Sequence, residues 1–126
     1  MNRHEAREKA FQILFQIDMN DIDPQSAMKS YLGTVEADSF LNTLIQGVVK
    51  NKTSIDETIM NHMENWSIHR IALVEKTIMR IATYEIMFLD DIPPGVSINE
   101  AVELAKIYGD EKSSKFVNGV LSKIIT

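Results

Sequence analysis

The 126-residue sequence predicts an all-α fold of about six or seven helices. Apolar residues recur at intervals of three and four along most of the chain, which is the spacing of one buried helix face. Caps and breakers such as Asp23-Pro24 and Pro93-Pro94-Gly95 divide these stretches into separate helices. The alternation of short strands with helices that indicates an α/β protein is absent from the sequence.

The first helix is predicted to start after Asn2, a favourable cap residue with Glu5 three positions later. Its buried face comprises Ala6, Ala10, Ile13, Leu14 and Ile17. An adjoining strip of cations and aromatic rings holds His4, Arg7, Phe11 and Phe15, with Arg3 on the first turn. Because Arg3 and Arg7 are four residues apart, they point the same way and can clasp a phosphate. The alternative is an ordinary amphipathic helix whose phenylalanines flank the core.

Three more helices are predicted in the first half of the chain. Asp23 and Pro24 have the residue types of the cap and first position of the second helix, which Gly33 ends. The third runs from about residue 37 to residue 50, and Ser54 with Glu57 forms a capping box for the fourth. The apolar face of the second helix comprises Ala27, Met28, Tyr31 and Leu32. That of the third comprises Phe40, Leu41, Leu44, Ile45 and Val48, and that of the fourth comprises Ile55, Ile59, Met63 and Trp66.

Trp66 is expected to anchor the core, and Ser67 to cap a turn before a helix that ends near Leu89. The apolar face of that helix comprises Val74, Ile78, Ile81, Ala82 and Leu89. Glu85 falls in its middle, so its carboxylate requires an arginine or the backbone amides of a helix start as partner. Catalysis by Glu85 is the alternative, but no second titratable group converges on it.

The C-terminal stretch carries two helices. Ser97 and Glu100 form a capping box for the first, and Gly109 is placed to end it in a left-handed conformation. Its apolar face comprises Ile98, Ala101, Val102, Ala105 and Tyr108. A polar bridge over residues 110–114 leads into the last apolar face, which comprises Phe116, Val117, Val120, Leu121 and Ile124.

Phe116 lies at the margin of this last face, beside Lys112, Lys123 and Gly119 on a helical wheel, with Lys115 next to it in the chain. A glycine inside a helix costs about 1 kcal/mol relative to alanine, so Gly119 is expected to permit a close approach. An aromatic ring beside lysines and bare backbone can stack a nucleobase. The alternative is a phenylalanine at the rim of a tight helix crossing.

Composition is that of an ordinary globular protein, with 44% hydrophobic and 25% charged residues. The length fits one domain, so we expect residues 1–126 to fold as a unit. No stretch approaches the roughly 18 apolar residues of a membrane span, and the N-terminus lacks the apolar core of a signal peptide. We therefore expect a cytoplasmic protein without membrane contact.

The sequence shows no catalytic or metal-binding motif. The absence of cysteine excludes disulfides, thiolate catalysis and cysteine-bound zinc. His4, His62 and His69 are scattered, and no carboxylate completes a metal-site spacing with them. We expect no enzymatic activity, no cofactor and no metal.

The net charge of −5 argues against a protein that simply coats nucleic acid, but the charge is uneven. Residues 106–126 carry four lysines against two acidic residues, and residues 1–15 carry three basic residues against two acidic ones. The excess of acid lies between these ends. Such a distribution suits RNA on one face and a basic partner on another.

Three segments of the sequence resemble one protein family. They are AREKAFQILFQ at residues 6–16, VEKTIMRIATYEI at residues 74–86, and INEAVELAKIYG followed by SSKFVNGVL near the C-terminus. In this order they are similar to the NusB family of bacterial transcription antitermination factors, and together they cover nearly the whole chain. The resemblance implies two small helical bundles packed across one another.

The resemblance also implies a function. NusB factors pair with the small-subunit ribosomal protein NusE, bind the single-stranded boxA element of nascent ribosomal RNA, and reach RNA polymerase with other Nus factors. The family's N-terminus is arginine-rich; here Arg3 and Arg7 match it, His4 and Glu5 replace further basic residues, and Phe15 replaces a common tyrosine. The candidate RNA-binding residues are Arg3, His4, Arg7, Phe15, Lys112, Lys115 and Phe116. For NusE, the candidates are Glu75 and Ile78.

Two other functions remain open from the sequence. NusB-like domains also form the N-terminal part of ribosomal RNA cytosine methyltransferases, but no methyltransferase segment follows before Thr126, which favours a free-standing factor. A helical protein-interaction module without RNA binding is the second. The family includes monomers and homodimers, and a homodimer could bury the RNA-binding face.

Overall fold

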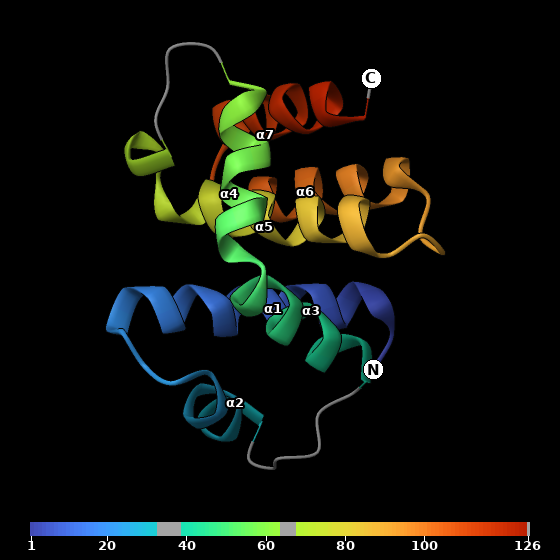
Figure 1. The fold of residues 1–126 in the computed structure, drawn as a ribbon. Coiled ribbons are helices and arrows are strands. Elements are labelled where there is room, and N and C mark those ends of the chain that lie inside the picture. The colour runs from blue at the N-terminus through green and yellow to red at the C-terminus, as the bar shows by residue number, and fades with distance from the viewer. Residues whose placement is uncertain (33–38, 64–67, 126) are drawn as a thin grey trace.

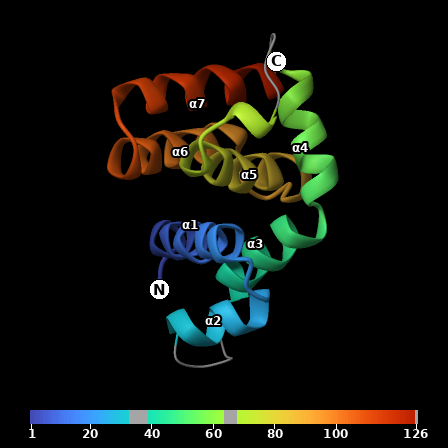
Figure 2. The same ribbon diagram turned by 90° about the vertical axis from the view of Figure 1, so that its left-hand side faces the viewer.

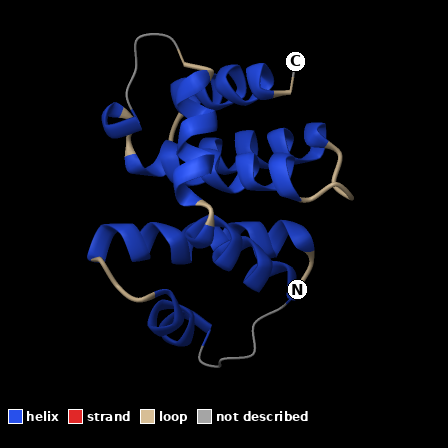
Figure 3. Cartoon of the chain, viewed as in Figure 1, coloured by secondary structure: helices blue, strands red, loops and turns tan. Residues whose placement is uncertain are grey.

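The structure, a computed structural model, describes residues 1–32, 39–63 and 68–125. These residues form seven α-helices and one short 3-10 helix, and no strand occurs among them (Figure 3). The helices are α1 (Arg3–Asn20), α2 (Pro24–Leu32), α3 (Ser39–Lys50), α4 (Lys52–Asn61), α5 (Leu73–Phe88), α6 (Pro94–Tyr108) and α7 (Glu111–Ile124), with η1 (Ile68–Arg70) before α5. The all-α prediction is confirmed.

The helices form two groups, as the resemblance implied. In Figure 1, α1, α2 and α3 make the lower group, and α4 to α7 make the upper one. The chain passes from one group to the other between α3 and α4, and α1 packs against α5 across the boundary. Buried apolar side chains from both groups form one continuous core. Within the described residues, no helix is long and apolar enough to cross a membrane.

Local sequence signals fix the first two helix starts. The Asn2 side chain accepts a hydrogen bond from the backbone N–H of Glu5 at 2.8 Å, so Asn2 is the cap of α1. The Asp23 carboxylate accepts one from the N–H of Ser26 at 3.1 Å and caps α2. Both predicted caps are confirmed. Gly33, the start predicted near residue 37, Trp66 and Ser67 lie outside the described residues.

Two other predicted helix starts are corrected. Ser54 lies inside α4, and its hydroxyl donates to the backbone oxygen of Asn51 at 3.1 Å. Ser54 is not the cap, because α4 already begins at Lys52. The N–H of Asn51 donates to the Gly47 carbonyl and the N–H of Ile55 donates to the Asn51 carbonyl, so backbone hydrogen bonds continue almost unbroken from α3 into α4. Ser97 lies inside α6, which starts three residues earlier because Pro94 is suited to the first helical position.

Gly109 ends α6 with φ of −119°, outside the left-handed region that was predicted. It is required for space instead, since a Cβ there would lie 2.7 Å from the Ser113 hydroxyl. The segment after it is not a separate bridge. Asp110 accepts a hydrogen bond from the N–H of Ser113 at 2.8 Å and caps α7, which starts at Glu111. This bond lowers the pKa of Asp110.

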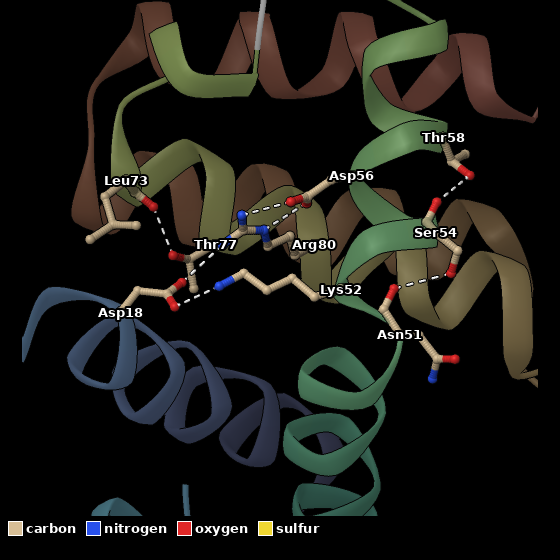
Figure 4. A network of polar contacts seen from close by, with 9 residues as sticks. All are labelled: Asp18, Asn51, Lys52, Ser54, Asp56, Thr58, Leu73, Thr77 and Arg80. Atoms are coloured by element: carbon tan, nitrogen blue, oxygen red, sulfur yellow. Dashed lines mark hydrogen bonds and ion pairs between the residues drawn. The ribbon is translucent and has the colours of Figure 1, made fainter. Parts of the chain in front are cut away.

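A charged network joins the two helix groups (Figure 4). The Arg80 guanidinium, on α5, donates to both carboxylate oxygens of Asp56 on α4, at 2.8 and 2.9 Å. Its third contact is to Asp18 on α1 at 2.9 Å, and Lys52 on α4 donates to the other Asp18 oxygen at 2.9 Å. The Arg80 side chain is 7% exposed. The network therefore fixes α1 against α4 and α5.

Candidate functional site

Glu85 is buried, at 1% exposure, and its partner is Arg7. The Arg7 Nε and Nη2 atoms donate to the two carboxylate oxygens at 2.9 and 2.8 Å, which is the strong two-bond geometry of an arginine–carboxylate pair. The Ser97 hydroxyl donates to the same carboxylate at 2.8 Å. The prediction of a structural, paired Glu85 is confirmed.

This pairing corrects the role predicted for Arg7. Its side chain is buried at 3% exposure, with its guanidinium carbon 5.3 Å from the centroid of the Phe40 ring. Burial by itself would lower the pKa of Arg7, but the hydrogen bond and charge of Glu85 raise the pKa above its ordinary value. A guanidinium that is buried, paired with Glu85 and 3.9 Å from a carboxylate oxygen of Glu100 at its Nη1 atom cannot form a phosphate clasp with Arg3.

Arg3 and His4 are exposed at the start of α1. Arg3 lies 3.4 Å from a carboxylate oxygen of Asp91 and 4.6 Å from the centroid of the Phe40 ring. His4 Nδ1 lies 2.8 Å from a carboxylate oxygen of Glu100, and this hydrogen bond raises the pKa of His4. Each cation thus has an acidic neighbour on its own protein.

An aromatic hollow lies at the other end of α1 and contains Phe15. The hollow has a volume of about 290 Å³ and is lined by Phe11, Gln12, Phe15, Gln16, Tyr31, Val74 and Tyr108. The rings of Phe11 and Phe15 lie 5.8 Å apart, and those of Phe11 and Tyr108 lie 4.6 Å apart. The Tyr108 hydroxyl accepts a hydrogen bond from Gln12 and donates one to Glu8. Four helices contribute to this hollow.

A second hollow, the Phe116 hollow, lies between α7 and the start of α5. It also has a volume of about 290 Å³ and is lined by Arg70, Ile71, Ala72, Glu75 and Phe116. Val74 lines the aromatic hollow and Glu75 lines this one, so both hollows border the first turn of α5. Lys112 and Lys115 are exposed on the first half of α7. The end of α1 and the start of α5, which border the two hollows, face the viewer in Figure 2.

The predicted RNA-binding residues therefore fall into two places. Phe15, Phe116, Lys112 and Lys115 lie at the end of the molecule that carries the two hollows. Arg3 and His4 lie at the start of α1, about 17–18 Å from Phe15 along the helix at 1.5 Å per residue.

The two residues predicted to bind NusE differ in their accessibility to a partner. Glu75 is half-buried and lines the Phe116 hollow, so a partner can reach it. Ile78 is 1% exposed and belongs to the core. A partner cannot contact Ile78 in this structure, and we correct that part of the prediction.

Comparison with known proteins identifies the family of this chain. The model of the NusB family matches residues 4–126. The chain belongs to the NusB family. Relatives include the transcription antitermination protein NusB of Oceanobacillus iheyensis, 58% identical over 99% of both chains. That of Geobacillus kaustophilus is 52% identical over 98% of this chain and 95% of its own.

Solved structures of NusB proteins share the fold. T. maritima NusB is 37% identical, with a TM-score of 0.88 over 98% of this chain and 90% of its own. A second match comes from a crystal structure of the antitermination factors NusB and NusE in complex with double-stranded RNA. It is 33% identical, with a TM-score of 0.85, and covers 98% of this chain and 97% of that chain.

In this member of the NusB family, sequence reasoning missed several residues of the two hollows. Tyr31 and Tyr108 were assigned only to apolar faces, and Arg70 was not assigned at all. They come from α2, α6 and η1, so no local spacing relates them to Phe15 or Phe116. Aromatic residues at the ends of predicted stripes were the available signal.

Proposed function

We propose that this chain acts in transcription antitermination by binding single-stranded RNA together with NusE. The observation that carries the proposal is the Phe116 hollow, which is lined by a half-buried aromatic ring and the exposed Arg70, with Lys112 and Lys115 exposed on the same helix as the ring. The NusB name of its relatives supports antitermination, and the similar NusB–NusE complex with double-stranded RNA supports NusE and RNA as partners.

Single-stranded RNA suits this end of the molecule because its bases are free to stack. Aromatic rings stack unpaired bases, and lysines neutralise the phosphates between them. Each hollow has room for a base, and both border the first turn of α5, so one RNA strand can place bases in both. We propose the boxA element of nascent ribosomal RNA as the target, in the cytoplasm, with RNA polymerase and other Nus factors reached indirectly.

Glu75 connects RNA binding to the partner. It lies in the same hollow as Phe116, so NusE bound at Glu75 also lies beside the RNA. The chain has a net charge of −5, which is unfavourable for RNA at long range. A basic partner at this position supplies the positive charge that the chain lacks.

Replacement of Phe116 tests the stacking surface. Because Phe116 also packs against the core, Phe116→Leu is preferred to alanine; it keeps an apolar side chain and removes the flat ring. Stacking on an aromatic ring contributes about 1–3 kcal/mol per base, so RNA affinity should fall about 5- to 150-fold, measured by fluorescence anisotropy in the presence of NusE. Phe116→Tyr is the control and should bind as the wild type. Equal binding by all three proteins would place the RNA elsewhere.

Reversal of the charge at Glu75 tests the NusE contact. Glu75→Lys should weaken association with NusE about 10- to 100-fold, about 1.4–2.8 kcal/mol, because the lysine repels the positive charge of a basic partner at the rim of the interface. RNA binding by the isolated chain should not fall, since the change adds a positive charge. Glu103→Lys, an equal charge change at an exposed position of α6, is the control. If calorimetry gives the wild-type dissociation constant for Glu75→Lys, NusE docks elsewhere.

A further inference from the structure

Within residues 1–32, 39–63 and 68–125, no tertiary contact requires a glycine at position 119. Gly119 lies in the interior of α7 and is exposed, and a Cβ built on it meets no atom of other described elements within 4 Å. Gly47 shows the contrast, because a Cβ there would overlap the Tyr84 ring where α3 and α5 cross. The described part of the chain therefore leaves the bare backbone at Gly119 open to another molecule.

The surroundings of Gly119 indicate what approaches. At 100° per residue, Lys112, Lys115 and Lys123 lie within about 40° of Gly119 around the helix axis. Phe116 lies about 60° away and one turn earlier, and it lines the Phe116 hollow. The acidic residues of this segment, Asp110 and Glu111, are confined to the start of the helix. The side of α7 that carries Gly119 therefore presents three lysines.

We propose that the sugar–phosphate backbone of RNA packs directly on the bare helix surface at Gly119. The inference rests on the proposed RNA binding and assigns a place to the backbone of the nucleotide whose base stacks on Phe116. Phosphates then lie among the three lysines, where their charge is neutralised. A ribose can pack against exposed helix backbone, and its 2′-hydroxyl can donate a hydrogen bond to a backbone carbonyl.

Any side chain at position 119 would hold the RNA away from this surface. The proposal therefore predicts opposite effects of Gly119→Ala on folding and on binding. The melting temperature should rise by about 2–5 °C, because alanine is the better helix residue and has room for its methyl group. RNA affinity should fall about 5- to 150-fold, the range expected when a methyl group is forced into a close contact.

The experiment measures binding of labelled single-stranded boxA RNA at saturating NusE to the full-length wild type, Gly119→Ala and Gly95→Ala. Gly95 is a matched control, since it is exposed near the start of α6 and a Cβ there also meets no atom within 4 Å. Gly95→Ala should bind RNA within twofold of the wild type. Wild-type affinity in Gly119→Ala, or an equal loss in both variants, would overturn the proposal.

A separate titration with NusE and no RNA distinguishes a protein partner from RNA at this surface. Gly119→Ala should bind NusE as the wild type does. A loss of NusE affinity with unchanged RNA affinity at saturating NusE would assign the Gly119 surface to a protein and overturn the proposal. The proposed function fails separately: it fails if the wild type with NusE binds no RNA, whereas wild-type RNA binding that Gly119→Ala does not weaken removes only this inference.

Discussion

Arg7→Met should lower the free energy of unfolding by about 3–5 kcal/mol, the loss expected when one partner of a buried ion pair is removed. In the part of the chain that the structure describes, the Ser97 hydroxyl then remains as the hydrogen-bond donor to the Glu85 carboxylate, which is 1% exposed. A charge in such a position has no water to replace the missing guanidinium. Urea denaturation followed by circular dichroism measures the change.

Arg3→Met is the matched control for this prediction. Arg3 lies one turn earlier on the same helix, is exposed, and contacts Asp91 at 3.4 Å, so its loss should cost less than about 1 kcal/mol. The double variant Arg7→Met, Glu85→Gln should recover part of the loss, because it removes the unpaired charge. Equal destabilisation by Arg3→Met and Arg7→Met would show that Arg7 is not the buried partner of Glu85.

Arg80→Met should cost a similar amount, about 3–5 kcal/mol, for a different reason. The wild-type guanidinium lies between Asp18 and Asp56, which belong to the two helix groups. Without it these carboxylates repel each other, and Lys52 alone remains on Asp18. The variant should unfold at a lower urea concentration. Because Asp18 lies on α1, hydrogen exchange should also quicken where α1 meets α4 and α5.

Arg70→Met is the control for Arg80→Met, since Arg70 is exposed in η1 and lines a surface hollow. Its stability should match that of the wild type within about 0.5 kcal/mol. Asp56→Asn, which keeps the shape and one acceptor oxygen, should destabilise less than Arg80→Met. A wild-type urea midpoint for Arg80→Met would contradict the role of this network in joining the groups.

The sequence predicted the helices and two of their caps because these depend on neighbouring residues. Asn2 and Asp23 bond backbone amides three residues away, a relation visible in the chain itself. The prediction of Ser97 as a helix cap was wrong because its hydroxyl donates a hydrogen bond to Glu85, twelve positions earlier. That contact exists only after folding. A capping motif shows where a helix can start, but a tertiary contact can take the capping side chain and the helix then starts elsewhere.

The same limit explains Arg7 and Glu85. The position of Glu85 on its helix showed that it needed a cationic or amide partner, but the partner is 78 positions away in the chain. Arg7 was assigned to the surface because a helical wheel does not show which neighbouring helix covers its margin. Phe116 was correctly placed at the margin of its apolar face, and it is half-buried.

The central claim is that this chain and NusE together bind boxA RNA. It is tested most directly by titrating labelled single-stranded boxA RNA with the chain alone, with NusE alone and with an equimolar mixture, at one fixed salt concentration. The mixture should bind at least about tenfold more tightly than either protein, and an RNA duplex should compete less well than the single strand. An affinity of the mixture equal to that of NusE alone would contradict the claim.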